Sequence, residues 1–92
     1  MAFPSDNFRH GRVLKFFPQG SYGFVKDEEG REFYFHLDEV RLEGQHRERS
    51  GVREGVWVGF DIGLTSRGER VTRLKIYTND EMNWVPSKAS GT

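Results

Sequence analysis

The sequence predicts an all-β fold, a small closed barrel of five antiparallel strands. Short runs in which apolar and polar residues alternate recur along the chain, as in strands that bury one face. Glycine and other turn-forming residues separate these runs, and 11 of the 92 residues are glycine. Apolar residues at helical spacing occur only in the short stretch 37–42. A closed barrel also leaves no strand edge exposed.

Five segments carry the strand pattern. The alternation is cleanest in the fourth, where Val56, Val58, Phe60 and Ile62 share one face. The five predicted strands are residues 12–17, 22–26, 32–36, 56–62 and 71–76.

Turns separate the predicted strands. Residues 18–21 close the first strand, and Gly30 supplies a positive φ to a hairpin turn at 27–30. One helical turn is expected at 37–40, and a turn at 65–68 connects the last two strands.

The one long connection is the polar segment 43–54, in which Val52 is the only strongly apolar residue. We expect residues 45–53 to contain no strand or helix and to be mobile. Residues 78–92 are rich in Ser, Asn and Gly and are expected to form a flexible tail, in which Trp84 is unexplained. The arginines in or beside the long loop are Arg41, Arg47, Arg49 and Arg53.

Composition and motifs exclude several classes of protein. The chain has no cysteine, which excludes disulfides and thiolate metal sites, and its three histidines lack the spacing of metal ligands. It contains no Ser/His/Asp set or phosphate-binding loop, so we expect neither an enzyme nor a bound cofactor. No apolar run approaches the roughly 20 residues that span a bilayer, and the first residues do not resemble a secretion signal. We therefore expect a soluble, cytoplasmic protein that does not bind membranes.

The charges balance but are unevenly placed. The chain has 14 basic and 14 acidic residues, a formal net charge of +0. Basic residues gather in segments 41–53 and 65–76, whereas many acids lie between Asp27 and Glu39. Such a chain can present one basic side to a polyanion. A solvated surface of mixed charge explains the same distribution equally well.

Aromatic side chains occupy both faces of the third predicted strand. Because a small barrel has one interior, the rings of one face must lie outside. The expected interior group is Val25, Phe33 and Phe35. The expected exposed group is Tyr22, Phe24, Tyr34 and His36. Nucleobases cover such a patch well, because stacking contributes roughly 1–3 kcal/mol per base and tolerates any sequence. A single ring in a strand is more often ordinary core, but aromatics on both faces favour a binding surface.

Two segments resemble the ribonucleoprotein motifs of cold-shock domains. Residues 20–25, Gly-Ser-Tyr-Gly-Phe-Val, are similar to the first motif, Lys-Gly-Phe-Gly-Phe-Ile. Residues 33–37, Phe-Tyr-Phe-His-Leu, are similar to the second, Val-Phe-Val-His-Phe. Shorter matches to the family are found at 11–13, 53–55 and 66–68, so that the similarity spans about residues 11–76.

The resemblance implies an oligonucleotide/oligosaccharide-binding barrel (OB-fold) that binds single-stranded RNA or DNA and has no catalytic activity. It implies a cold-shock domain over residues 9–77 with an N-terminal extension at 1–8. The protein is expected to be a monomer or a weak or domain-swapped dimer. A role as an RNA chaperone or regulator of gene expression follows from the same resemblance. The residues expected to bind nucleic acid are Lys15, Phe16, Tyr22, Phe24, Tyr34, His36, Arg67 and Arg70.

The sequence departs from the family's pattern at several positions. Gly20 stands where the family has a lysine, and Leu37 where it has a ring. In the first strand, an ungapped match puts the family's stacking Trp at Lys15 and its core Phe at Phe16. A match in which the turn at 18–21 is one residue shorter than in the family puts the family's stacking Trp at Phe16 instead. We prefer the second match, because it keeps an aromatic ring on the binding face.

A protein–protein interaction module is the alternative function. In that interpretation the barrel is cold-shock-like, and the arginine-rich loop and Trp84 contact a protein partner. The missing motif lysine and the zero net charge favour it. Binding to a labelled oligothymidine, with duplex as the control, distinguishes the two functions.

Overall fold

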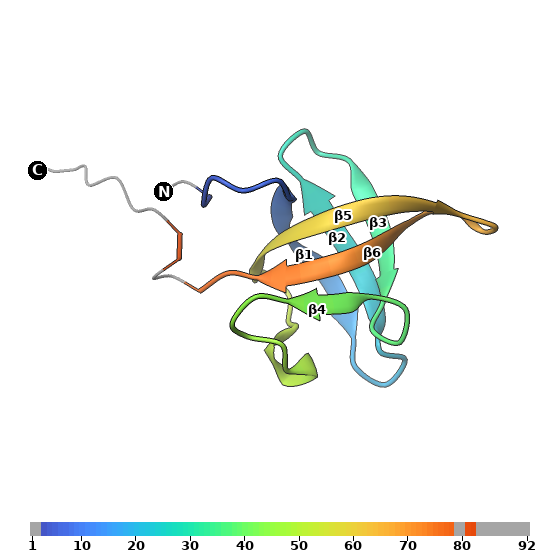
Figure 1. Ribbon diagram of the computed structural model, residues 1–92. Helices are drawn as coiled ribbons and strands as arrows, with labels where there is room; N and C mark the ends of the chain where they lie inside the picture. The colour runs from blue at the N-terminus through green and yellow to red at the C-terminus, as the bar shows by residue number, and fades with distance from the viewer. Residues whose placement is uncertain (1–2, 79–80, 83–92) are drawn as a thin grey trace, which may run out of the picture.

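The computed structural model describes residues 3–78 and 81–82 of the chain. This part contains six β-strands and no α-helix, and therefore no helix long and apolar enough to cross a membrane (Figure 1). The predicted all-β class is confirmed. The predicted tail, including Trp84, falls outside the described residues except at 78, 81 and 82. The strands are β1 (Arg9–Phe17), β2 (Tyr22–Asp27), β3 (Glu32–His36), β4 (Arg41–Glu43), β5 (Trp57–Thr65) and β6 (Gly68–Ile76).

All six strands belong to one sheet, in the order β3-β2-β1-β5-β6-β4. Five of them, β1, β2, β3, β5 and β6, correspond to the predicted strands and pair antiparallel. The sixth, β4, was not predicted; it pairs in parallel with β6 and places Leu42 opposite Leu74. The backbone hydrogen bonds do not close the sheet into the predicted five-stranded barrel: the sheet is open, with β3 and β4 as its edges.

The sheet curls so that β3 approaches β6, although no backbone ladder joins the two. Arg31, in the turn before β3, lies 3.9 Å from the Glu69 carboxylate of β6. The guanidinium carbon of Arg70 lies 4.2 Å from the centre of the Tyr34 ring. Side chains therefore connect β3, at one edge of the sheet, to β6, which is four strands away in the sheet order.

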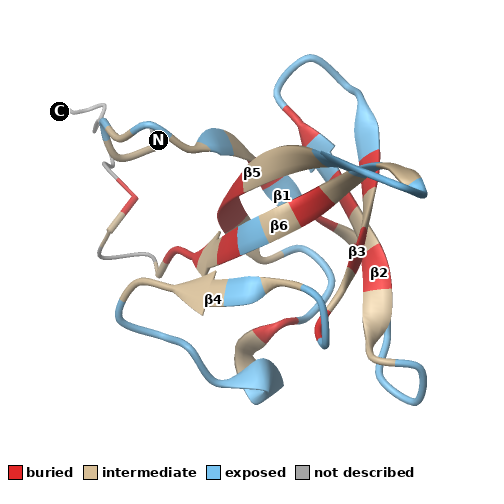
Figure 2. Ribbon diagram, turned by 45° about the vertical axis from the view of Figure 1, so that its right-hand side comes forward, coloured by how far each residue is buried: buried red, intermediate tan, exposed pale blue. Residues whose placement is uncertain are grey.

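The core fills the inside of this curved sheet. Buried residues recur at alternate positions of the strands (Figure 2), as the alternating sequence predicts. Val58 and Phe60 of β5 are fully buried, while Val56 and Ile62 pack partly buried against them. Val52, the single strongly apolar residue of the long loop, is 2% exposed and anchors that loop to the core.

Two predicted turns are present. Gly30 has φ +87°, and its N–H donates to the Asp27 carbonyl at 3.1 Å, which closes the β2–β3 hairpin. After β3, the His36 carbonyl accepts from the N–H groups of Glu39 at 2.9 Å and Val40 at 3.0 Å, as in a single helical turn.

The N-terminal segment packs on the outside of the sheet, where Asp6 is its main polar anchor. The Asp6 carboxylate accepts hydrogen bonds from the Tyr77 hydroxyl at 2.5 Å and from the Phe8 N–H at 3.1 Å, and it lies 2.8 Å from His10 Nε2. The Phe3 ring stacks on His10 with 4.6 Å between centroids. The described part of the predicted N-terminal extension is therefore bound to the folded domain.

The contacts of Asp6 predict acid sensitivity. Burial raises the pKa of the Asp6 carboxyl, but the hydrogen bonds from Tyr77 and His10 lower it more, so the pKa lies below its ordinary value of 3.8. A lowered pKa in the folded state stabilises the fold above the unfolded-state pKa, and this contribution is lost as pH falls through the folded-state value. The unfolding free energy of an Asp6→Asn variant should therefore be lower than that of the parent at about pH 6, with a difference that shrinks below about pH 4. Urea unfolding at several pH values measures this, and a difference that does not depend on pH would contradict the charge effect.

Candidate nucleic-acid interface

The predicted exposed rings lie together on the outer face of β2 and β3. In both strands the intervening residues point inward, and Val25 and Phe35 are fully buried. The antiparallel register places Phe24 opposite Tyr34. It likewise places Tyr22 opposite His36. The prediction of which residues share each face is confirmed for both strands.

The Tyr and Phe rings of this face touch one another. The Tyr34 ring is at its centre, with its centroid 5.9 Å from that of Tyr22 and 5.8 Å from that of Phe24. Phe17, which is 41% exposed, stacks on Tyr22 at 5.0 Å. We call Phe17, Tyr22, Phe24, Tyr34 and His36 the ring face.

The structure corrects the prediction for the first strand. The register of β1 against β2 shifts between Val13 and Lys15, which makes an irregularity at Leu14. After it, Lys15 pairs with Phe24 and is exposed, while the Phe16 ring stacks on the buried Phe35 ring at 6.0 Å. Phe16 therefore packs against the core rather than on the ring face. This is the arrangement of the ungapped match, with Lys15 outward and Phe16 inward.

Phe17 is the ring-face residue that sequence reasoning missed. It pairs with Tyr22 across the β1–β2 ladder, so both side chains lie on the same side of the sheet. The adjacent rings at 16 and 17 were the available signal, because one of two successive strand residues must point outward.

Arg70 and Arg67 lie beside the ring face but share one carboxylate. The Arg70 side chain is 13% exposed, lies over the Tyr34 ring and has its Nη2 3.2 Å from Glu39 Oε1. Arg67, which is 73% exposed, lies 3.7 Å from the same carboxylate. Their charges are therefore partly neutralised in the free protein.

The ring of His36 is oriented by the turn that follows β3. Its Nδ1 accepts the Asp38 N–H at 3.0 Å. In a neutral imidazole, acceptance at Nδ1 leaves the proton on Nε2, which is then a donor. His36 can thus stack on a base and also donate to a base oxygen.

The long loop reaches the end of the ring face. Contrary to the prediction that it lacks secondary structure, it contains a 3₁₀ turn, η1 (Arg49–Gly51). The Arg49 guanidinium donates to the Asp38 carboxylate, and this hydrogen bond lowers the pKa of Asp38. A hollow of about 310 Å³ separates the loop from the sheet, with Phe16, Leu37 and Arg53 on its walls. Leu37 is only 5% exposed, so it belongs to the core rather than to a base-binding surface.

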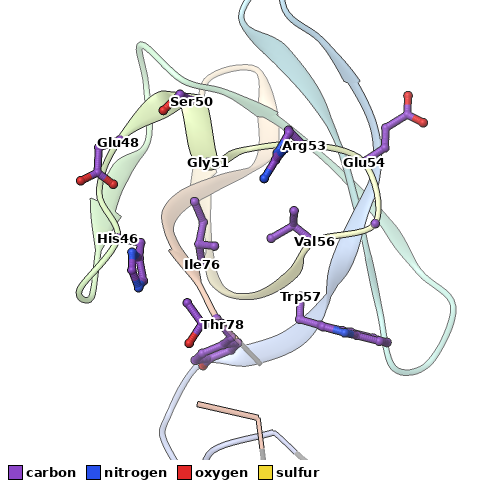
Figure 3. Close-up of a pocket in the computed structure, with 12 residues that line it drawn as sticks. His46, Glu48, Ser50, Gly51, Arg53, Glu54, Val56, Trp57, Ile76 and Thr78 are labelled. Atoms are coloured by element: carbon purple, nitrogen blue, oxygen red, sulfur yellow. The ribbon is translucent and has the colours of Figure 1, made fainter. Parts of the chain in front are cut away.

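A second hollow, of about 740 Å³, lies between the same loop and the end of β6 (Figure 3). Its walls combine apolar side chains such as Val56 and Ile76 with polar ones such as His46 and Ser50. Thr78 also lines this hollow, and its hydroxyl donates to the Glu81 carboxylate at 3.3 Å. The described part of the chain contains no group of three or more His, Cys, Asp or Glu residues placed to hold a metal ion.

Seven of the eight predicted binding residues lie on or beside the ring face, and Phe16 alone does not. The neighbours of the ring face are Lys15 on β1, Arg70 on β6 and Arg67 in the β5–β6 turn. Comparison with protein-family models gives no match to the chain, and no curated protein matches its sequence.

Proposed function

We propose that the protein binds single-stranded nucleic acid through the ring face. The observation that carries this proposal is a continuous set of partly exposed aromatic side chains on one outer face, with Lys15 beside Phe24. Stacking on such rings contributes roughly 1–3 kcal/mol per base, and every base offers a flat surface to stack. The proposal includes no catalytic step.

We infer further that the curved sheet is an OB-fold barrel of the cold-shock type. The two motif-like segments form β2 and β3, which carry most of the ring face. The approach of β3 to β6, through Arg31 and Arg70, supports a barrel that closes by side-chain contacts.

Occupation of the ring face by unpaired bases gives the protein a chaperone-like action on RNA. A duplex keeps its bases stacked inside, so the rings can engage only strands that are open. Binding therefore favours the unpaired state by mass action. We propose that a protein with this role acts in the cytoplasm.

Fluorescence anisotropy with a labelled oligothymidine tests the proposal, with an oligouridine and a duplex of the same length for comparison. We expect tight binding to single strands and much weaker binding to duplex. Because few cations near the ring face are free of carboxylates, the slope of log K against log salt should lie near −2 to −3, at about −0.7 per phosphate contacted. Binding to none of the three would overturn the proposal and favour a protein partner. A slope beyond about −5 would mean that many more arginines reach the strand.

Removal of the Glu39 charge should strengthen binding. A Glu39→Gln variant frees Arg67 and Arg70 from their shared carboxylate. An exposed ion pair is worth about 0.2–1 kcal/mol, and we expect the affinity to rise by this amount. The salt slope should steepen by about 0.7 for each further phosphate that the freed arginines bind.

Glu43→Gln is the matched control for Glu39, because Glu43 pairs with Arg41 at 3.5 Å on β4. This variant removes the same charge away from the ring face. Equal effects of the two variants on affinity would mean that Glu39 acts only through the overall charge of the protein.

A further inference from the structure

A row of unpaired cations extends from the ring face across the outside of β1 and β2. Arg12 pairs with Lys26 in the strand register, Lys15 pairs with Phe24, and all three cations are exposed. Within residues 3–78 and 81–82, none of the three forms an ion pair, although Glu32 lies opposite Lys26 in the β2–β3 ladder. The described cations that do form ion pairs with carboxylates are Arg9, Arg31, Arg41, Arg49, Arg67, Arg70, Arg73 and Lys75.

This row ends at Trp57, the first residue of β5. Trp57 pairs with Arg12 in the β1–β5 ladder and is partly exposed, while the following residue, Val58, is fully buried. Trp57 also lines the hollow of Figure 3. The Arg12 guanidinium carbon lies 5.9 Å from the Trp57 ring centre, and the Phe3 ring meets Trp57 edge-on at 5.6 Å.

A narrow slot lies against this indole. It has a volume of about 140 Å³, and its walls include Phe3, Arg12, Lys26 and Trp57, with the acidic residues Asp27 and Glu28 also at its boundary. The Trp57 indole offers a flat apolar surface to a heterocycle, and Phe3, which is itself stacked on His10, meets that indole edge-on. The carboxylate of Glu28 repels a phosphate but tolerates a neutral base. The slot therefore suits a nucleobase, whereas the open row of cations suits a phosphate backbone.

We propose that Trp57 is a second stacking position for a nucleobase, reached by a single strand that leaves the ring face across Lys15, Arg12 and Lys26. This inference rests on the proposed function. Because β2 and β5 both flank β1, they are about two strand spacings, or about 10 Å, apart. The register adds the two residues from Phe24 to Lys26 along β2, or about 7 Å. Trp57 is therefore about 12 Å from Phe24, which corresponds to about three to four stacked nucleotides. A strand that covers both positions is therefore longer than one that covers the ring face alone.

The test compares oligothymidines of about 4 and about 12 nucleotides, lengths within the range of OB-fold sites. Trp57→Leu, which keeps apolar bulk but removes the ring, should weaken binding of the longer strand roughly 5- to 150-fold, the equivalent of one stacked base. It should leave the shorter strand unchanged. Trp57→Phe, which keeps a ring, should bind the longer strand almost as the parent does. In a Trp84→Phe background, in which Trp57 is the one remaining tryptophan, the longer strand should quench fluorescence and the shorter should not.

A variant that leaves the indole in place tests the cation row independently. Arg12→Gln with Lys26→Gln should flatten the salt slope of the longer strand by about 1.4, the value for two phosphate contacts. Arg41→Gln with Arg73→Gln, which removes two exposed charges from β4 and β6, is the matched control and should change the slope less.

Two outcomes would overturn the inference while the proposed function stands. The longer strand could bind Trp57→Leu as tightly as the parent, or both strands could lose affinity equally, which would make Trp57 a support for the ring face. Failure of the parent to bind either strand would instead overturn the proposed function, and the inference with it.

Discussion

Replacement of Tyr34 by alanine is expected to weaken the binding of a short oligothymidine by about 1–3 kcal/mol, the contribution of one stacked base. The upper end of this range is expected because Tyr34 occupies the centre of the ring face. It contacts Tyr22 and Phe24, and Arg70 lies over its ring. Its loss removes one stacking surface and also leaves its neighbours free to move. Fluorescence anisotropy at fixed salt measures the change.

Tyr34→Phe is the control for this variant, because it keeps the ring and removes only the hydroxyl. It should bind nearly as the parent does. Circular dichroism must first establish that both variants are folded, since unfolding of Tyr34→Ala alone would place the ring in the core. Parent-like affinity of a folded Tyr34→Ala protein would contradict the ring-face proposal.

The two faces of β2 and β3 could be predicted because their sequence alternates without interruption. A strand of period two buries every second residue, so Val25, Phe33 and Phe35 leave Phe24 and Tyr34 outside. The turn at Gly30 was predictable for a similar local reason, because a positive φ there favours glycine.

The first strand could not be predicted in the same way. One extra residue in a strand reverses the faces of all the residues after it. Around Leu14 the sequence offers apolar side chains in both registers, so the position of the irregularity has no local signal. The assignment of Phe16 to the ring face failed for this reason, and Phe17 was missed with it.

Long-range pairs were also beyond the reach of local patterns. The strand β4 is three residues long and forms by pairing in parallel with β6. Asp6 meets Tyr77, which lies 71 residues later in the chain. Arg67 and Arg70 were predicted as binding residues, but the carboxylate that neutralises them, Glu39, comes from the turn after β3. The sequence shows which residue types can form a site. It does not show which residues far away in the chain pair with them and change their charge.

Gly23→Ala should destabilise the fold strongly, because Gly23 lies where three strands meet. It pairs with Phe16 on β1 and with Phe35 on β3. An added Cβ would overlap the carbonyl oxygen of Lys15 and lie 3.0 Å from two ring atoms of Phe35. A backbone oxygen cannot move aside as a side chain can, so the ladder itself must shift. Overpacking costs typically 1–3 kcal/mol, and we expect about 3.

Thermal unfolding measures the effect. In a domain of this size about 3 kcal/mol corresponds to a fall in Tm of roughly 12–24 °C. Gly30→Ala is the control, because Gly30 has φ +87° but an added Cβ would have room there. That Cβ would lie 3.9 Å from the Lys26 Cε, an ordinary contact distance. That variant has backbone strain without overlap, which costs about 1–2 kcal/mol. If Gly30→Ala lowers Tm as much as Gly23→Ala does, β1 and β2 do not pack as closely at Gly23 as the structure indicates. Because Gly23 separates Tyr22 from Phe24, a shift of this ladder should also misplace both rings and weaken binding of single strands in any Gly23→Ala protein that still folds.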